Sequence, residues 1–343
     1  MEHLLEVRDL EVRFALRSGD FTAIDKIRFS LDRGERMGLV GESGAGKSVT
    51  GFSILNLISK PGYIAGGQIF FRGRDLAGLS VAEMRSVRGN RISMIFQDPM
   101  MTLNPVMTIG DQMVETLMAH RKISRASAEA LSVEKLKAVH IPSPETRLRQ
   151  YPHEFSGGMR QRIVIAIALL TDPDLIIADE PTTALDVTIQ AEIMDLLLEL
   201  CTLQKMAMIL ITHDLGVVSQ VTEKIAVMYA GRIVEMGSTE NIVANPQHPY
   251  TKGLIRALPG SREAGVRLYQ IPGSMPNLSS IPEGCAFNPR CEMALDLCRH
   301  ETPELRQRGA FQRQVACHRV GEIPEKKSEP CFPAGHGEGN ENG

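Results

Sequence analysis

The feature that most constrains the fold of this chain is the octapeptide GESGAGKS, residues 41–48. It fits the pattern G-x-x-x-x-G-K-[ST], follows the apolar stretch MGLV and precedes a stretch with helical spacing. Glycines let backbone N–H groups converge on phosphate oxygens, and the start of a helix adds the positive end of its dipole. The sequence therefore predicts a strand–loop–helix unit that binds a nucleotide, although a glycine turn could match by chance.

Two side chains of this loop have predicted chemical roles. Lys47 can reach the β- and γ-phosphates of a nucleotide, and Ser48 can ligate Mg²⁺. The neighbouring residues contribute mainly backbone contacts. The predicted nucleotide-binding residues here are Gly41, Glu42, Ser43, Gly44, Ala45, Gly46, Lys47, Ser48 and Val49.

A second polar site follows the apolar stretch LIIADE, residues 175–180. A buried strand there delivers Asp179 to its carboxyl end, where ligands of α/β sheets bind. We expect Asp179 to hold Mg²⁺, directly or through water, and Glu180 to act as the general base that activates water. Alone this pattern is weak, because many solvated strand ends look similar, but it complements the glycine loop.

The fold class follows from the order of periodic segments. Strands are expected within residues 1–40 and at 91–97, 174–179 and 206–212, with a hairpin at 224–237. Helices are expected at 48–58, 109–120, 127–139, 157–170 and 188–204. This alternation predicts an α/β protein with a mostly parallel sheet covered on both faces.

The chain of 343 residues divides by composition. Around residue 245 the pattern becomes irregular and rich in proline and glycine, and the last stretch is polar and glycine-rich. We therefore expect a main domain at residues 1–247, a small irregular extension at 248–320 and a disordered tail at 321–343.

Charge and hydropathy exclude some classes of protein. The formal net charge is −3, with 38 basic and 41 acidic residues, which gives no support for nucleic-acid binding. The apolar run at 163–170 is far shorter than the roughly 20 residues that a bilayer requires. The first residues carry charges throughout and contain no apolar signal segment. The chain is expected to stay in the cytoplasm, where thiols are reduced.

The stretch EFSGGMRQR, residues 154–162, resembles the LSGGQ signature of ATP-binding cassette (ABC) proteins. It keeps Ser156, Gly157 and Gly158 and departs at Phe155 and Met159, the latter as in the peptide-importer branch. Such a helix start offers a hydroxyl and free N–H groups to a phosphate. The resemblance implies that this phosphate belongs to ATP held by the opposite subunit, so that ATP joins a dimer and hydrolysis releases it.

The other elements of an ABC ATPase occur in the expected order. Gln97 in IFQDP is similar to the Q-loop, a catalytic and Mg²⁺-binding element. Asp186 ends a segment like the D-loop, and His213 in LITHD resembles the switch histidine. Phe14 falls where the family places an aromatic ring under the adenine. The resemblance therefore implies a P-loop ATPase domain with an antiparallel β subdomain, in which Lys47, Gln97, Glu180 and His213 act in catalysis.

A narrower resemblance, from about residue 4 to residue 319, is to the ATPase subunits of bacterial dipeptide, oligopeptide and nickel importers. It rests on MIFQDPMMTLNPVMTIGDQM, ADEPTTALDVTIQAEIMDLL and NPQHPYTKGLIRALP. It implies ATP hydrolysis coupled to peptide import at the cytoplasmic face of the inner membrane. The implied partners are two permease subunits, which contact the segment after Gln97, a second and different ATPase subunit, and an extracytoplasmic solute-binding protein.

Other functions stay open at this stage. The same machinery could import nickel or another small solute, because the ATPase never touches the solute. A soluble ABC ATPase without a permease is a further alternative, as is an iron–sulfur or zinc regulatory module with a decayed ATPase. The intact Lys47, Asp179, Glu180 and His213 argue against decay.

Four cysteines gather in the extension: Cys285, Cys291, Cys298 and Cys317. Their spacing lacks the close C-x₂₋₄-C pairs of structural zinc, and a reduced compartment disfavours disulfides. Four thiolates suit an iron–sulfur cluster, and the resemblance implies a [4Fe–4S] site at matching positions. We therefore expect such a cluster, with zinc or four packed, reduced thiols as the alternatives, and no part for Cys201 or Cys331.

Overall fold

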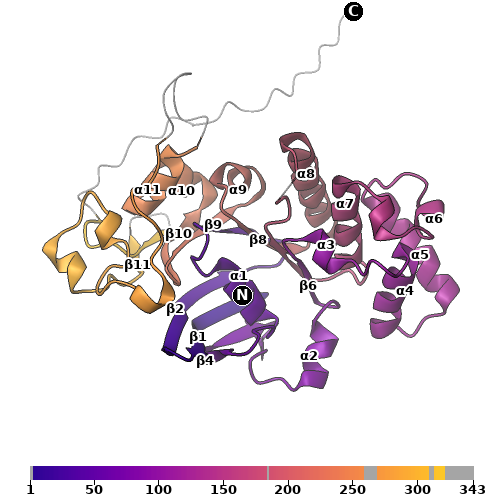
Figure 1. The fold of residues 1–343 in the computed structure, drawn as a ribbon, viewed down its shortest axis with the longest axis horizontal. Coiled ribbons are helices and arrows are strands. Elements are labelled where there is room, and N and C mark those ends of the chain that lie inside the picture. Colours follow the sequence, from indigo (N-terminus) through magenta and orange to yellow (C-terminus); the bar gives the residue numbers. More distant parts are fainter. Residues whose placement is uncertain (1–2, 184, 259–268, 309–312, 321–343) are drawn as a thin grey trace, which may run out of the picture.

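The computed structural model describes residues 3–183, 185–258, 269–308 and 313–320 (Figure 1). The strands are β1 (Leu5–Leu16), β2 (Gly19–Leu31), β3 (Arg36–Val40), β4 (Gly62–Phe71), β5 (Arg74–Asp75), β6 (Ile92–Ile95), β7 (Leu175–Asp179), β8 (Ala207–Thr212), β9 (Lys224–Tyr229), β10 (Arg232–Ser238), β11 (Arg306–Arg308) and β12 (Arg313–Val315). The α-helices are α1 (Lys47–Ile54), α2 (Val81–Val87), α3 (Pro99–Thr102), α4 (Ile109–His120), α5 (Arg125–Ala138), α6 (Pro144–Arg147), α7 (Gly157–Ala168), α8 (Val187–Gln204), α9 (Leu215–Val221), α10 (Thr239–Ala244) and α11 (Pro249–Arg256). Short 3₁₀ helices are η1 (Pro152–Glu154), η3 (Leu278–Ser280), η4 (Asn288–Arg290) and η5 (Asp296–Arg299).

The larger sheet forms the centre of the molecule. Its strand order is β11-β12-β10-β9-β3-β8-β7-β6; the strands from β9 to β6 are parallel to one another, and β10 pairs antiparallel with β9. Every residue of β7 and β8 is buried, as expected for parallel strands covered on both faces. The predicted fold class is therefore confirmed.

A smaller antiparallel sheet, in the order β2-β1-β4-β5, packs against the large sheet. Apolar side chains of β1 and β2, such as Val12 and Ile24, share one core cluster with Leu39 of β3 and Ile211 of β8. This burial of apolar area holds the two sheets together. The smaller sheet is the antiparallel β subdomain that the resemblance implied.

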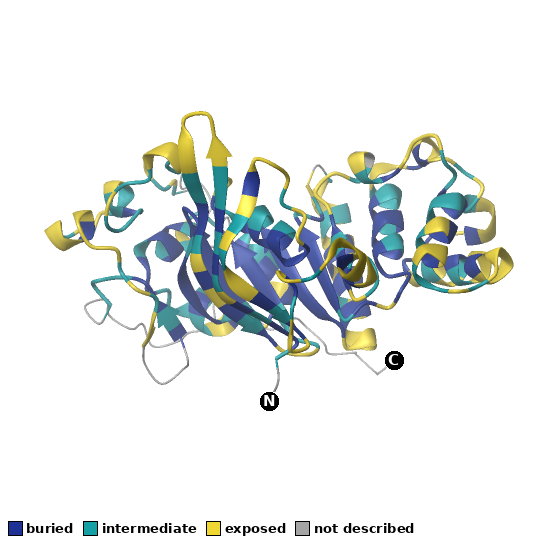
Figure 2. Cartoon of the chain, turned by 90° about the horizontal axis from the view of Figure 1, so that it is seen from below, coloured by how far each residue is buried: buried dark blue, intermediate teal, exposed yellow. Residues whose placement is uncertain are grey.

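A helical group occupies the other side of the molecule (Figure 1). Leu117 of α4, Leu136 of α5 and Ile163 of α7 belong to a second core cluster that also includes residues of α8 and β8. Buried residues follow the strands and the inner faces of these helices, whereas exposed residues gather on the outer turns (Figure 2). None of the helices in the described part of the chain has both the length and the apolar character that a membrane crossing requires.

The extension shares its core and its sheet with the rest of the chain. Strand β12 pairs antiparallel with β10, and Phe287 packs edge-on against Tyr229 of β9, with 5.2 Å between ring centroids. Tyr250 of α11 lies 4.7 Å from Tyr229 in the same cluster. The predicted domain boundaries stay predictions, and the predicted tail at 321–343 lies outside the described residues.

The buried His248 gives a pH-dependent prediction. Its Nδ1 accepts the backbone N–H of Tyr250 at 3.1 Å, and burial lowers its pKa to about 3. The unfolded chain binds a proton at this residue below about pH 6.5, whereas the folded chain does not, so stability is lost as the pH falls from about 6.5 toward 3.

Between pH 7 and pH 5, we expect wild type to lose about 2 kcal/mol more unfolding free energy than the His248→Asn variant, whose amide can still cap the helix. Urea unfolding curves at both pH values measure this. An equal loss in the two proteins would contradict the prediction.

Candidate nucleotide-binding site

The glycine loop lies between the end of β3 and the start of α1, as predicted. Gly46 precedes α1 with φ of 104°, a left-handed conformation that side chains rarely adopt. A Cβ there would lie 2.7 Å from Ile24 Cδ1, and one on Gly41 would lie 2.3 Å from the Met228 carbonyl oxygen. The loop therefore keeps its shape only with glycine at these two positions.

The loop is fixed on one side and open on the other. The turn between β9 and β10 donates the Gly231 N–H to the carbonyl of the fully buried Ala45 at 2.9 Å. Ser43 and Gly44, at the tip, are exposed. The loop can thus present its tip to a ligand without losing its support.

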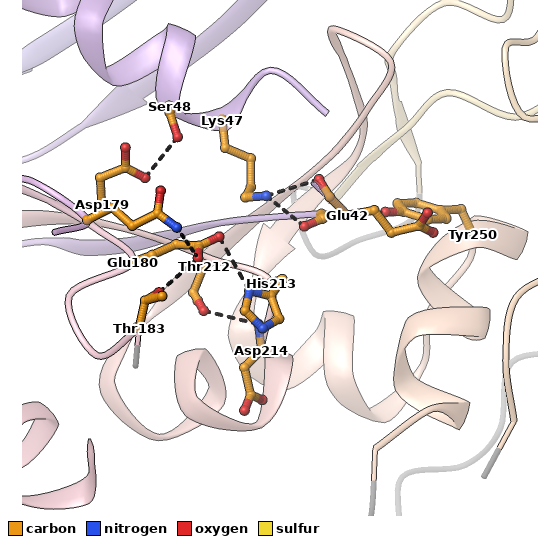
Figure 3. A network of polar contacts seen from close by, with 12 residues as sticks. Glu42, Lys47, Ser48, Asp179, Glu180, Thr183, Thr212, His213, Asp214 and Tyr250 are labelled. Carbon is orange, nitrogen blue, oxygen red and sulfur yellow. Dashed lines mark hydrogen bonds and ion pairs between the residues drawn. The ribbon is translucent and has the colours of Figure 1, made fainter. Parts of the chain in front are cut away.

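Lys47 points back into the loop (Figure 3). Its Nζ donates to the carbonyl oxygens of Gly41 at 2.8 Å and Glu42 at 3.0 Å. Burial lowers the pKa of the amine, and the nearby carboxylates of Glu180, Asp179 and Glu42 oppose that change. Three negative groups around a buried amine favour its charged form, which a phosphate requires.

Ser48 and Asp179 fit a magnesium site. The hydroxyl of Ser48, at the start of α1, donates to Asp179 Oδ1, at the end of β7, at 3.0 Å. Asp179 is buried; desolvation raises its pKa, and the bond from Ser48 lowers it. Hydroxyl and carboxylate oxygens are ligands that Mg²⁺ prefers, so this pair has the right chemistry.

Three polar side chains contact the carboxylate of Glu180 (Figure 3). Its Oε2 accepts from Gln97 Nε2 at 3.2 Å and from Thr183 Oγ1 at 3.0 Å, and His213 Nδ1 lies 3.3 Å from Oε1. Gln97 follows β6, Glu180 follows β7 and His213 follows β8, so three neighbouring strand ends bring them together. The sequence did not point to Thr183.

Other predicted residues lie elsewhere. Ser156 is exposed at the start of α7, where it accepts the Met159 N–H at 3.4 Å, and Gly157 and Gly158 follow it. Asp186 accepts the Ile189 N–H at 3.0 Å at the start of α8. Within the described residues, no hydrogen bond or ion pair joins Ser156 or Asp186 to the loop. Their predicted roles remain predictions.

Phe14 and Val49 support the smaller sheet. The ring of Phe14, on β1, lies within 2.8 Å of where a Cβ on Gly62 would stand. Both residues pack on the edge of the core cluster that joins the two sheets. The predicted contact of Phe14 with an adenine base remains a prediction.

Sequence reasoning missed two residues that hold the loop from outside. The hydroxyl of Tyr250 accepts the backbone N–H of Glu42 at 2.8 Å. The guanidinium of Arg290 pairs with the carboxylate of Glu42. Tyr250 lies in the segment NPQHPYTKGLIRALP, but no pattern around either residue indicates a partner more than 200 residues away.

The prediction of a [4Fe–4S] cluster is wrong. Cys285, Cys291, Cys298 and Cys317 do line one pocket. Nevertheless, no group of three or more His, Cys, Asp or Glu side chains among the described residues could hold a metal ion, which also removes the zinc alternative. These four cysteines are free thiols.

Burial changes the acidity of these thiols. Desolvation raises the pKa of Cys285 to about 11 and also raises the pKa of Cys291 and Cys317, which favours the protonated form. Phe287 anchors the extension on Tyr229 and Tyr250. Cys201 is buried in α8, and Cys331 lies outside the described residues.

A glycine loop that opens a helix, beside an acidic pair at the end of a parallel strand, defines a P-loop nucleotide-hydrolysing protein. Residues 24–183 match the family described as ABC transporter, and residues 234–298 match the oligopeptide/dipeptide transporter C-terminal region. The chain belongs to the ABC transporter family as an ATP-hydrolysing subunit of the oligopeptide/dipeptide branch. Membership implies permease partners in a membrane.

Curated relatives are similar over most of the chain. The oligopeptide transport ATP-binding protein OppD of Salmonella typhimurium is 50% identical over 88% of this chain and 89% of its own length. OppD of Bacillus subtilis is 51% identical over 88% of this chain and 85% of its own. The dipeptide transport ATP-binding protein DppD of Bacillus subtilis is 50% identical over 87% and 89%.

Solved structures share the fold. The chain matches the ATP-binding cassette MJ0796, in a dimeric post-hydrolysis state bound to ADP and Pi, with a TM-score of 0.62 and 24% identity. That match covers 68% of this chain and 98% of the other. The match to cbiO1 from Clostridium perfringens has a TM-score of 0.60 and 25% identity over 71% and 91%.

Replacement of Lys47 by alanine tests the site. Because the amine is the charged donor nearest the loop carbonyls, we expect the ATP dissociation constant to rise about 10- to 150-fold, the value of one charge-assisted hydrogen bond. Isothermal calorimetry with MgATP measures this change. Lys122→Ala, at an exposed position, is the control and should bind like wild type; equal affinity in both variants would remove Lys47 from the site.

Proposed function

We propose that this chain powers the import of peptides across a bacterial inner membrane by hydrolysing ATP. The observation that carries the proposal is the 50% identity, over most of the chain, to proteins named for oligopeptide and dipeptide transport. Import of nickel or another small solute by the same machinery is the alternative. A soluble ABC ATPase without a permease is a weaker one, because the C-terminal region belongs to a transporter family.

The proposed assembly contains two permease subunits, a second ATPase subunit that differs from this one, and an extracytoplasmic solute-binding protein. The chain would lie at the cytoplasmic face of the inner membrane as a peripheral subunit. No nucleic acid takes part, in keeping with the net charge of −3.

The segment that follows Gln97 is the proposed permease contact. Met101 is 86% exposed and Val106 is 79% exposed, while Leu103 between them is buried and anchors the segment. Phe96, next to Gln97, is also partly exposed. Exposed apolar side chains that flank a residue bonded to Glu180 could couple a permease helix to the catalytic carboxylate.

The proposed chemistry begins with the phosphate loop. Lys47 and the backbone N–H groups of the loop bind the β- and γ-phosphates of ATP. Bound Mg²⁺, held by Ser48, Asp179 and Gln97, would neutralise negative charge on the phosphates. Asp179 already bonds Ser48, so these two ligands start in place.

Glu180 is the proposed general base. It takes a proton from water as the water oxygen bonds to the γ-phosphorus, and the bond from phosphorus to the β–γ bridging oxygen breaks. ADP keeps that oxygen and its electron pair, and inorganic phosphate leaves. Gln97 and Thr183 orient the carboxylate through its Oε2, and His213 lies beside Oε1, from where it would contact the leaving phosphate.

Glu180→Gln tests the chemistry and the function together. The variant removes the base but nearly keeps the shape, so we expect normal ATP binding and a loss of hydrolysis of about 10²–10⁴-fold. Vesicles that contain the chain with its permeases, second ATPase and binding protein should accumulate labelled peptides with wild type and not with this variant.

Uptake of Ni²⁺ and of amino acids by the same vesicles is the control for the solute. Near-normal hydrolysis by Glu180→Gln would remove it as the base. ATP-dependent uptake of nickel but not of any peptide would replace the proposed solute, while leaving the ATPase assignment intact.

Ser156→Arg tests the composite dimer site. We propose that Ser156 contacts the nucleotide of the opposite subunit, so the larger cation should block ATP-dependent dimerisation and leave the ATP affinity of the isolated chain unchanged. Light scattering with and without ATP measures dimerisation. Ser86→Arg, on an exposed position of α2, should dimerise normally; loss of ATP binding by the isolated Ser156→Arg chain would contradict the proposal.

A further inference from the structure

The C-terminal extension reaches the phosphate loop through one arginine. Arg290 lies in η4, and its guanidinium forms two parallel bonds to the carboxylate of Glu42: Nη1 to Oε2 at 3.0 Å and Nη2 to Oε1 at 3.1 Å. The Arg290 side chain is only 7% exposed. A bidentate pair of this kind, with its guanidinium shielded from water, is stronger and more directional than a surface ion pair.

Partners other than Glu42 also hold the guanidinium of Arg290 in one orientation. Its Nε donates to the Pro272 carbonyl at 2.7 Å, and Nη1 also donates to the Tyr229 hydroxyl at 3.3 Å. The charge lies 5.7 Å from the ring centroid of Tyr229 and 5.8 Å from that of Phe287. Backbone and aromatic partners therefore fix the position from which Arg290 binds the loop.

Glu42 is held at three points. Arg290 binds its carboxylate, Tyr250 accepts its N–H, and Lys47 donates to its carbonyl oxygen. The first two partners come from the C-terminal part of the chain. Met275 of the same region lies 3.9 Å from where a Cβ on Gly44 would stand, so the extension also lies close to the tip of the loop.

These contacts have a consequence for ATP binding. To bind the phosphates of ATP, Lys47 must give up its hydrogen bonds to the carbonyl oxygens of Gly41 and Glu42. ATP therefore binds more tightly if other residues keep the loop in shape when those bonds are lost. In addition, an unpaired carboxylate on Glu42 would repel a polyanion bound to the same loop. Arg290 meets both needs: it holds Glu42, and so the loop, in place, and it neutralises the negative charge of the Glu42 carboxylate.

We propose that Arg290 is a positioning residue for ATP, through which the C-terminal extension sets the nucleotide affinity of the phosphate loop. The proposal depends on ATP binding at this loop and not on the identity of the transported solute. Because coupling between two sites is reciprocal, ATP must also stabilise the fold of the extension around Arg290.

The first experiment is a set of charge variants in the full chain. For Arg290→Gln we expect the dissociation constant for MgATP, and the KM for ATP of the assembled transporter, to rise about tenfold to a hundredfold, with kcat within about twofold. Arg290→Lys should lie between this variant and wild type, since an ammonium keeps the charge but not the bidentate geometry.

The double variant Glu42→Gln/Arg290→Gln separates this role from a structural one. Removal of both charges should return the ATP affinity to that of Glu42→Gln alone, whereas simple damage to the extension would leave the double variant as weak as Arg290→Gln. Arg306→Gln is the matched control, because Arg306 pairs with Glu304 on the exposed surface of the same extension. It should bind ATP like wild type.

Hydrogen exchange provides a second readout that does not depend on the variants folding well. In wild type, MgATP should slow exchange of the Cys285 and Cys298 amides, whose N–H groups are bonded within the extension. Absence of this protection, or an Arg290→Gln variant that binds ATP like wild type, would overturn the proposal. Failure of wild type to bind ATP would overturn it together with the ATP site, whereas failure of peptide uptake alone would leave it standing.

Discussion

The site depends on the parallel register of four strands. β3, β8, β7 and β6 are hydrogen-bonded neighbours that run in one direction, so their carboxyl ends open onto the same edge of the sheet. Asp179 ends one of these strands, and the others come after a strand in the chain: Lys47, Glu180, His213 and Gln97. Complete burial of β7 and β8 shows that both faces of these two strands are covered, which leaves their carboxyl ends as the open edge of this part of the sheet.

Much of this site could be predicted because its residues sit in local motifs. The glycine loop indicated Lys47 and Ser48, and the strand end indicated Asp179 and Glu180, by chemistry alone. Gln97 and His213 needed the family resemblance, since an isolated glutamine or histidine carries no such signal. Helices at 109–120 and 188–204 were recovered to within a residue because their apolar spacing is regular.

The sequence-based predictions failed at places where segments that are distant in the chain come into contact. β4 was not predicted, since Gly66 and Gly67 interrupt its pattern at a bulge where it pairs with β1. Arg290 and Tyr250 were missed because Glu42 lies more than 200 residues before them. The cysteine spacing was interpreted as metal ligation because sequence does not reveal that Phe287 packs against Tyr229 of the ATPase domain and against Tyr250, which gives the extension a core without a metal.

The pairing of β12 with β10 has a consequence for the order of events during synthesis. Without β12, the edge of β10 would present unpaired backbone groups, which are a template for association with other chains. β10 ends at Ser238, but β12 begins only at Arg313, so the ribosome must release the whole intervening segment before this edge can be covered. The edge of β10 can therefore be covered only after the extension has been synthesised, so the extension completes the ATPase sheet as well as contacting the phosphate loop.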